Sequence, residues 1–179
     1  MRPSVFNKFP GNVFAVAALA VATIPYVFAQ TQVAEVDAVL NDLHDAASRG
    51  DYNRYFSHFS DDAVFLGTDP DERWTTSQFR IYAKPRFERD GGWTYTPVER
   101  HVFLSKDRQV AWFDETLNSK KYGNMRGTGV LAKSGTTWKL TQYNLLKPIP
   151  NDLFVKIVEM IEAQRGGNSN QRSTAPTTK

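Results

Sequence analysis

A continuous β-rich region from Trp93 to Lys147 is the feature that most limits how this chain can fold. Clusters of turn-forming residues at 105–108, 118–124 and 133–137 divide it into runs rich in β-branched and aromatic side chains. Such runs, joined by short turns, predict four strands linked by hairpins, roughly over 93–104, 109–117, 125–133 and 137–147. An antiparallel meander of this kind needs helices to cover its apolar face.

The segment before the strands supplies those helices. Apolar residues at helical spacing predict a helix over 33–49 that ends at Gly50. Asp51 can cap a short second helix, and a short apolar strand follows over 63–67. The apolar positions expected on the two helices are Val36, Val39, Leu40, Leu43, Ala47, Tyr52, Tyr55, Phe56 and Phe59.

Two overlapping start signals precede a third helix. Asp69 with Glu72 is one signal, and Thr75 with a glutamine three residues later is the other. We expect Asp69 and Glu72 to act as helix caps and Pro85 to end or kink this helix. After the last strand, the prolines at 148 and 150 predict a stop, and a terminal helix follows with Leu153, Ile157, Val158 and Ile161 on one face.

The first 29 residues predict a cleavable signal peptide. Arg2 and Lys8 precede an apolar run over 13–24, and Val27 and Ala29 occupy the −3 and −1 positions of a small-residue cleavage site. An uncleaved anchor is the alternative, but a spanning helix needs about 20 apolar residues. We therefore expect no stable membrane anchor after cleavage, a mature chain that begins at Gln30, and a secreted or periplasmic location.

Composition supports one folded domain over residues 30–164, followed by a disordered tail over 165–179 that is rich in glycine, serine and threonine. The net charge of +3 comes from the two ends, because 17 basic and 19 acidic side chains remain between them. That balance gives no electrostatic footprint for nucleic acid. Because the chain has no cysteine, disulfides, thiolate catalysis and cysteine-bound metals are excluded. The three histidines have no ligand spacing, so we expect no metal and no cofactor.

The order of a long helix, an aromatic helix, a short strand, a capped helix and four long strands resembles the nuclear transport factor 2-like superfamily, and in particular its exported SnoaL-like members. The segments AVFLGTD, ERW, RGTGVL and WKLTQYNL look like the pocket-lining and strand-edge segments of that family. The resemblance covers residues 33–148. It implies an α+β cone in which helices pack on a curved, mainly antiparallel sheet. Members of the superfamily include isomerases, dehydratases, cyclases, binding modules and assembly domains, so the resemblance alone assigns no function.

Strand alternation gives candidate pocket residues in such a cone. Lys139 and Thr141 are expected to point outward, which turns the opposite face of the last strand inward. Matching large apolar residues on the neighbouring strands extends the inward set, although a shift of one residue would exchange Asp114 for Glu115. The predicted catalytic residues are Asp114 and His44, and the predicted ligand-binding residues are Tyr55, Trp74, Trp112, Arg126, Thr128, Gln142 and Asn144.

Asp114 or His44 could act as a general base, and Arg126 could hold a carboxylate or an enolate-like oxygen. Simpler roles compete with these. Asp114 and Arg126 could form a cross-strand ion pair, His44 could be a core histidine, and Gln142 and Asn144 could bond neighbouring segments. The two glycines of RGTGVL do not precede a helix, so they form no phosphate loop and instead fit a bulge or bend in the sheet.

Three functions follow from these observations. The first is a binding module that holds a small, mostly apolar ligand without turnover. The second is an enzyme of the ketosteroid isomerase or polyketide cyclase type that moves a proton next to a carbonyl. The third is an assembly domain, a homodimer formed through an outer sheet patch of Phe113, Tyr143 and Leu145.

Overall fold

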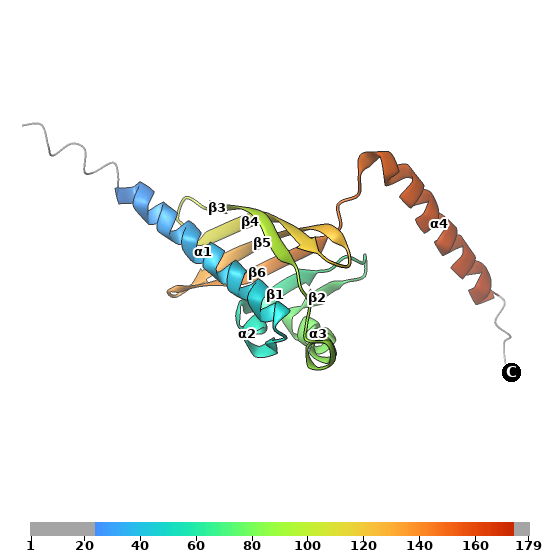
Figure 1. Ribbon diagram of the computed structural model, residues 1–179, viewed down its shortest axis with the longest axis horizontal. Coiled ribbons are helices and arrows are strands. Elements are labelled where there is room, and N and C mark those ends of the chain that lie inside the picture. Colours follow the sequence, from blue (N-terminus) through green and yellow to red (C-terminus); the bar gives the residue numbers. More distant parts are fainter. Residues whose placement is uncertain (1–23, 174–179) are drawn as a thin grey trace, which may run out of the picture.

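The computed structural model describes the backbone of residues 24–173 and the side chains of residues 30–165 (Figure 1). The first two helices precede two strands and a third helix, and four long strands and a terminal helix follow. In chain order the elements are α1 (Ile24–Ser48), α2 (Tyr52–Ser57), β1 (Phe59–Leu66), β2 (Arg73–Thr75), α3 (Thr76–Asp90), β3 (Thr96–Leu104), β4 (Val110–Ser119), β5 (Gly123–Ser134), β6 (Thr137–Leu146) and α4 (Asn151–Ser173).

The strands form one six-stranded sheet in the order β2-β1-β6-β5-β4-β3. Every neighbouring pair is antiparallel except β1 and β6, which run parallel. Helix α1 lies across one face of this sheet, and α2 and α3 lie near the end of α1 (Figure 1). The four predicted hairpin strands are confirmed within a few residues, and the molecule is an α+β cone with a mainly antiparallel sheet.

The hydrophobic core lies between the helices and the inner sheet face. Helix α1 turns its predicted apolar side to the core, where Val36, Leu40 and Leu43 are almost fully buried. From α2 and α3, Phe56 and Phe79 pack ring against ring, with centroids 5.3 Å apart. The core is therefore aliphatic under α1 and aromatic under α2 and α3.

Helix starts follow the expected chemistry, with one correction. Asp51 caps α2 by accepting from the backbone N–H of Arg54. Thr75 is the N-cap of helix α3 and forms a reciprocal capping box with Gln78. The prediction that Asp69 and Glu72 cap a helix is wrong, because they close a tight turn before β2, in which the Asp69 N–H donates to Glu72 Oε2.

Pro85 does not end α3, which continues for five more residues to Asp90. A proline inside a helix leaves the carbonyl four residues earlier without its donor. Here that residue is Ile81, whose side chain is 76% exposed. Water can therefore donate a hydrogen bond to the freed carbonyl, and the helix continues beyond the proline.

The predicted inward faces of β4 and β5 are wrong. On β4, Ala111, Phe113, Glu115, Leu117 and Ser119 are buried and the alternate residues point outward. On β5 the buried set begins at Met125, so Arg126, Thr128 and Val130 lie on the outer face. The shift of one residue exchanges the inner and outer faces of both strands, because side chains alternate between faces with period two.

On β6 the prediction is right for the first half of the strand only. Trp138 and Leu140 point inward, as expected. The pairing with β5 then shifts, since Val130 pairs with Gln142 while Leu131 pairs with Leu140. Thr141 is thus an extra residue in a β-bulge, which turns Tyr143 and Leu145 inward and leaves Gln142 and Asn144 outside.

The predictions for the two ends of the chain concern its signal peptide and its tail. Residues 1–23 of the predicted signal peptide lie outside the described residues, and the predicted cleavage site at Ala29 lies within α1. Helix α4 extends away from the sheet in Figure 1 and continues to Ser173, into the segment for which the sequence predicts a disordered tail. Its predicted apolar face is exposed, with Leu153, Val158 and Ile161 each more than 40% accessible. Across residues 24–173, no helix is long and apolar enough to cross a membrane.

Candidate functional site

A cavity of about 840 Å³ opens between α3, the β4–β5 turn and the inner sheet face. Its lining combines aromatic walls, a small polar floor and a charged mouth. Nine aromatic side chains line it: Tyr55, Phe65, Trp74, Phe79, Tyr82, Trp93, Tyr95, Tyr122 and Tyr143. Several of these rings stack nearly parallel, and the planes of Trp74 and Phe79 differ by only 7°. The walls suit a flat, apolar molecule.

The floor of the cavity is organised around Glu115, whose side chain is fully buried. Its Oε1 accepts from the Tyr143 hydroxyl at 2.9 Å and lies 2.9 Å from His44 Nε2. Its Oε2 accepts from Arg100 Nε at 2.9 Å. Both carboxylate oxygens are therefore engaged by neighbours from α1, β3 and β6.

Arg100 connects this acid to the first helix. Its side chain is 8% exposed, and its Nη1 donates to Asn41 Oδ1 at 2.9 Å and contacts Asp37 Oδ1 at 3.2 Å. Because β3 and β4 pair Arg100 directly with Glu115, the guanidinium bridges the sheet and α1. The charge pair thus fixes the helix against the sheet at the floor of the cavity.

The environment of Glu115 sets its charge state. Burial acts to raise its pKa, but the hydrogen bond from His44 and the positive charges of His44 and Arg100 outweigh burial and hold the pKa below its usual value. Burial and the adjacent Glu115 carboxylate raise the pKa of Tyr143 well above its usual value. At neutral pH the floor therefore holds an ionised carboxylate and a neutral tyrosine hydroxyl.

A glycine makes room for this arrangement. A Cβ atom at Gly127 would lie 2.6 Å from the Tyr143 hydroxyl and 2.7 Å from Glu115 Oε1. At Gly129 it would lie 2.7 Å from the Phe113 ring. The glycines of RGTGVL were expected to mark a bulge or bend, but the bulged residue is Thr141 on β6, and the glycines instead face inward and leave space for buried side chains.

Of the nine predicted site residues, the structure brings three together. His44, Tyr55 and Trp74 line the cavity. The other six lie on the outer sheet face, away from the cavity, because of the one-residue shift and the bulge: Asp114, Trp112, Arg126, Thr128, Gln142 and Asn144.

The expected ion pair between Asp114 and Arg126 is also absent from the ion pairs of the described residues, because Asp114 pairs with Thr128 across the strands. Asp114 instead contacts His101 Nδ1 at 3.2 Å, and both side chains are 54% exposed. This contact is on the outer face and contributes nothing to the cavity.

Sequence reasoning missed Arg100, named Glu115 only as the residue that a one-residue shift would bring inward, and placed Tyr143 on the outer face. A signal for β4 was present, because Ala111, Phe113 and Leu117 are apolar at alternate positions while the opposite set turns polar after Trp112. The bulge that directs Tyr143 inward had no comparable signal.

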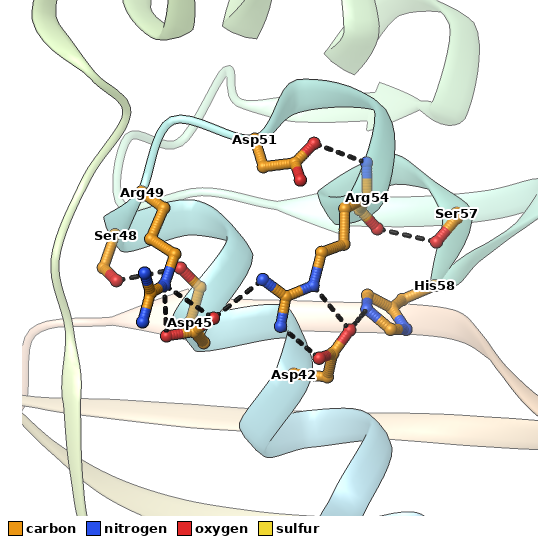
Figure 2. Close-up of polar contacts among 8 residues, drawn as sticks. All are labelled: Asp42, Asp45, Ser48, Arg49, Asp51, Arg54, Ser57 and His58. Atoms are coloured by element: carbon orange, nitrogen blue, oxygen red, sulfur yellow. Dashed lines mark hydrogen bonds and ion pairs between the residues drawn. The ribbon is translucent and has the colours of Figure 1, made fainter.

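A second polar network lies outside the cavity, where α2 meets α1 (Figure 2). Arg54 donates to both Asp42 and Asp45, with Nη1 2.7 Å from Asp45 Oδ2, and His58 Nε2 lies 2.8 Å from Asp42 Oδ2. Hydrogen bonds from Arg54 lower the pKa of Asp42, whereas burial lowers the pKa of His58. This network joins two helices and reaches no cavity residue.

Nothing in the part of the chain that the structure describes brings three or more histidine or acidic side chains together as metal ligands. The oxygens of Glu115 are already engaged by the Arg100 guanidinium, His44 and the Tyr143 hydroxyl, an arrangement unlike that of a cation site. The floor can therefore bind a neutral polar group through Tyr143 and His44.

The SnoaL-like domain profile matches residues 36–150 of this chain, a stretch that begins at the buried Val36 in α1 and ends after β6. This chain belongs to the SnoaL-like domain family. Among curated proteins, none matches the sequence.

Solved structures place this SnoaL-like domain in the nuclear transport factor 2-like fold. A nuclear transport factor 2-like protein of unknown function from Pseudomonas putida matches with a TM-score of 0.56 at 12% identity, over 66% of this chain and 87% of that one. A candidate dehydratase of the same family from Streptomyces avermitilis matches with 0.55 at 16% identity, over 68% and 99%. A candidate scytalone dehydratase from Novosphingobium aromaticivorans matches with 0.57 at 11% identity, over 67% and 86%.

Proposed function

We propose that this SnoaL-like domain binds a small, mostly apolar molecule in its cavity without converting it. The observation that carries the proposal is the cavity of about 840 Å³ with nine aromatic side chains in its lining. Aromatic walls with a few convergent polar groups are typical of small-molecule sites. Tyr143 and His44 supply those polar groups at the floor.

The state of Glu115 favours binding over turnover. A carboxylate that acts as a general base needs an oxygen that can reach the substrate and a pKa near the working pH. Glu115 already accepts from Tyr143, His44 and Arg100, and its pKa is held low. Asp114, the other carboxylate expected to act as a base, lies on the outer face.

Native mass spectrometry of the protein purified from the cells that make it would test this proposal. We expect a reproducible mass above that of the denatured chain, and its loss in Trp74→Ala. Trp112→Ala is the matched control, because it makes the same truncation on the outer face, where Trp112 is 46% exposed. No adduct from native cells, together with no binding of apolar probes, would overturn the proposal.

Proton transfer next to a carbonyl is the second candidate function. It is favoured by the 2.9 Å contact of His44 Nε2 with Glu115, because a carboxylate that holds one imidazole nitrogen orients the ring and supports the other as a base. The candidate dehydratases among the structural neighbours share the fold at 16% identity or less. Their names therefore only suggest which reaction to test.

Deuterium exchange separates the two functions. The ligand recovered from the native adduct would be incubated with the protein in D₂O and examined by mass spectrometry. Uptake of deuterium that is lost in His44→Gln would support proton transfer, while a bound ligand that takes up none would support binding alone.

We also propose that the domain forms a homodimer through its outer sheet face. The predicted patch of Phe113, Tyr143 and Leu145 is wrong, since all three are buried. Exposed apolar side chains on that face include Phe103 and Trp112, whose rings stack with centroids 5.8 Å apart. Sedimentation velocity should show a dimer that dissociates in Trp112→Asp, and a monomeric native chain would contradict the proposal.

Export remains a proposal that rests on the sequence of the first 29 residues. The intact mass of the protein recovered from the medium or periplasm should correspond to a chain beginning at Gln30. A chain that retains Met1 in the membrane fraction would contradict it.

A further inference from the structure

Cationic side chains surround the mouth of the cavity. Arg86 and Arg89 come from the last turns of α3, Lys120 and Lys121 from the β4–β5 turn, and Lys147 from the residue after β6. Three separate parts of the chain thus direct positive charge to one opening. The domain as a whole is close to neutral, so this concentration is local.

The two arginines are partly neutralised. Asp90 lies 2.9 Å from Arg86 Nη1 and 3.1 Å from Arg89 Nη2. Arg86 Nε also donates to the Gly92 carbonyl, which holds the side chain at the end of α3. The arginine side of the mouth therefore contributes about one net positive charge.

The lysine side has no such neutralisation. Within the described residues, Lys120, Lys121 and Lys147 form no ion pair with a carboxylate. Lys147 Nζ donates to the carbonyl oxygens of Tyr122 and Asn124 at 2.9 and 2.8 Å, and Lys121 lies over the Tyr122 ring. Lys147 is thus held beside the β4–β5 turn, and its charge stays available at the opening.

Glu72 is the acidic residue among the side chains that line the opening. Glu72 lines the same space as Arg86, Tyr82 and Tyr95. With Asp90 set against one of the five lining cations and Glu72 against another, about three net positive charges remain at the mouth. A ligand that fills the cavity and reaches the mouth therefore meets a positive field.

We propose that the ligand is an amphipathic organic anion, with an aromatic or other flat apolar body between the walls and an acidic group at the mouth beside Lys120, Lys121 and Lys147. This inference rests on the proposed binding function and adds the charge and orientation of the ligand. The apolar body lies toward the floor, because the aromatic side chains line the interior of the cavity and the three lysines are exposed at its mouth.

Two fluorescent probes separate the preference for an anionic ligand from the ability of the cavity to bind any apolar molecule. 8-Anilinonaphthalene-1-sulfonate and N-phenyl-1-naphthylamine share one ring skeleton, and only the first carries an anionic group. Titration of the full chain should give at least about tenfold tighter binding of the sulfonate, with an affinity that falls as salt is raised. Equal affinities would overturn the anionic ligand but leave the pocket in place, whereas no binding of either probe would overturn the pocket as well.

A matched pair of triple variants places the charge at the mouth. Replacing Lys120, Lys121 and Lys147 together with glutamine should weaken the sulfonate about tenfold and leave the neutral probe unchanged. The control replaces Lys106, Lys133 and Lys156 with glutamine, which makes the same change in net charge away from the mouth. Equal losses in the two triple variants would show a general charge effect and overturn the proposed orientation.

Discussion

At position 127, the absence of a side chain allows two buried polar groups to approach the sheet. Glu115 and Tyr143 meet directly over Gly127, from the strands on either side of it. An added methyl group would lie within 2.7 Å of an oxygen of each side chain, which is shorter than a normal van der Waals contact. Neither side chain is an exposed, flexible one that could move aside, so this position controls the floor of the cavity.

Gly127→Ala should therefore lower the free energy of unfolding by about 2 to 4 kcal/mol, from overpacking and a strained buried hydrogen bond. Chemical denaturation measures this loss. Combining it with Tyr143→Phe, which removes the nearest atom, should cost less than the sum of the two single changes. Additive costs would mean that the methyl group does not meet the hydroxyl.

Glu115 and Asp114 are adjacent carboxylates on opposite faces of one strand, which makes them a natural comparison. Glu115→Gln leaves the buried guanidinium of Arg100 without its main counterion, and we expect a loss of about 3 to 5 kcal/mol. Asp114→Asn changes the same charge on the exposed face and should cost under about 0.5 kcal/mol. Similar small losses in both variants would contradict the role of Glu115 as an anchor between sheet and helix.

Among the secondary-structure elements, the strands show which signals in a sequence are reliable. Turn clusters predicted the four long strands well, and the capping box of α3 and the cap of α2 were readable because a few adjacent residues determine them. The inward faces were harder to predict. Trp112 is large and apolar yet lies outside beside Phe103, so matching large residues chose the wrong side of β4.

The bulge at Thr141 explains the rest of the error. It depends on how β6 meets both β1 and β5, and the pairing with β1 is itself irregular between Phe59 and Val64. No local sequence pattern indicates how one strand pairs with two neighbours at once. The buried acid cluster could not be predicted for the same reason, since Tyr143 reaches Glu115 only after the bulge.

The contact between α1 and α2 should depend on pH. The pKa of His58 is lowered in the folded protein, so the unfolded chain binds a proton first as the pH falls below about 6.5, and stability decreases from there downward. Asp42 opposes this decrease, because its charge and hydrogen bond raise the pKa of His58. The pKa of Asp42 is itself lowered, so its own contribution is lost only below about 3.8.

Asp42→Asn should therefore make the loss of stability between pH 6.5 and pH 5 steeper than in the unaltered protein. Denaturant midpoints measured across this range test the slope. His58→Gln is the control, in which this part of the slope should disappear. A shallower slope in Asp42→Asn would show that the carboxylate does not support the protonated imidazole.

At the scale of the whole molecule, α4 stands outside the cone. Its side chains are exposed through Arg165, apart from the half-buried Ile157, and the family match ends at residue 150, just before the helix begins. Ending the chain after Pro150 should therefore shift the melting temperature by less than about 2 °C at low protein concentration. Leu140→Ala, in the core of β6, should cost about 2 to 5 kcal/mol by comparison. A large loss on removal of α4 would mean that the helix packs on the cone.

The parallel pairing of β1 with β6 has a consequence for how the protein is made. β1 ends at residue 66, but its parallel neighbour β6 begins at residue 137, so about half of the domain must be synthesised between them. Until then the helices have no complete sheet to cover, and closing that long loop is a slow step in folding. We therefore expect the nascent chain to leave its aromatic core residues exposed until β6 has been synthesised, and the cavity to form only after that strand has joined the sheet.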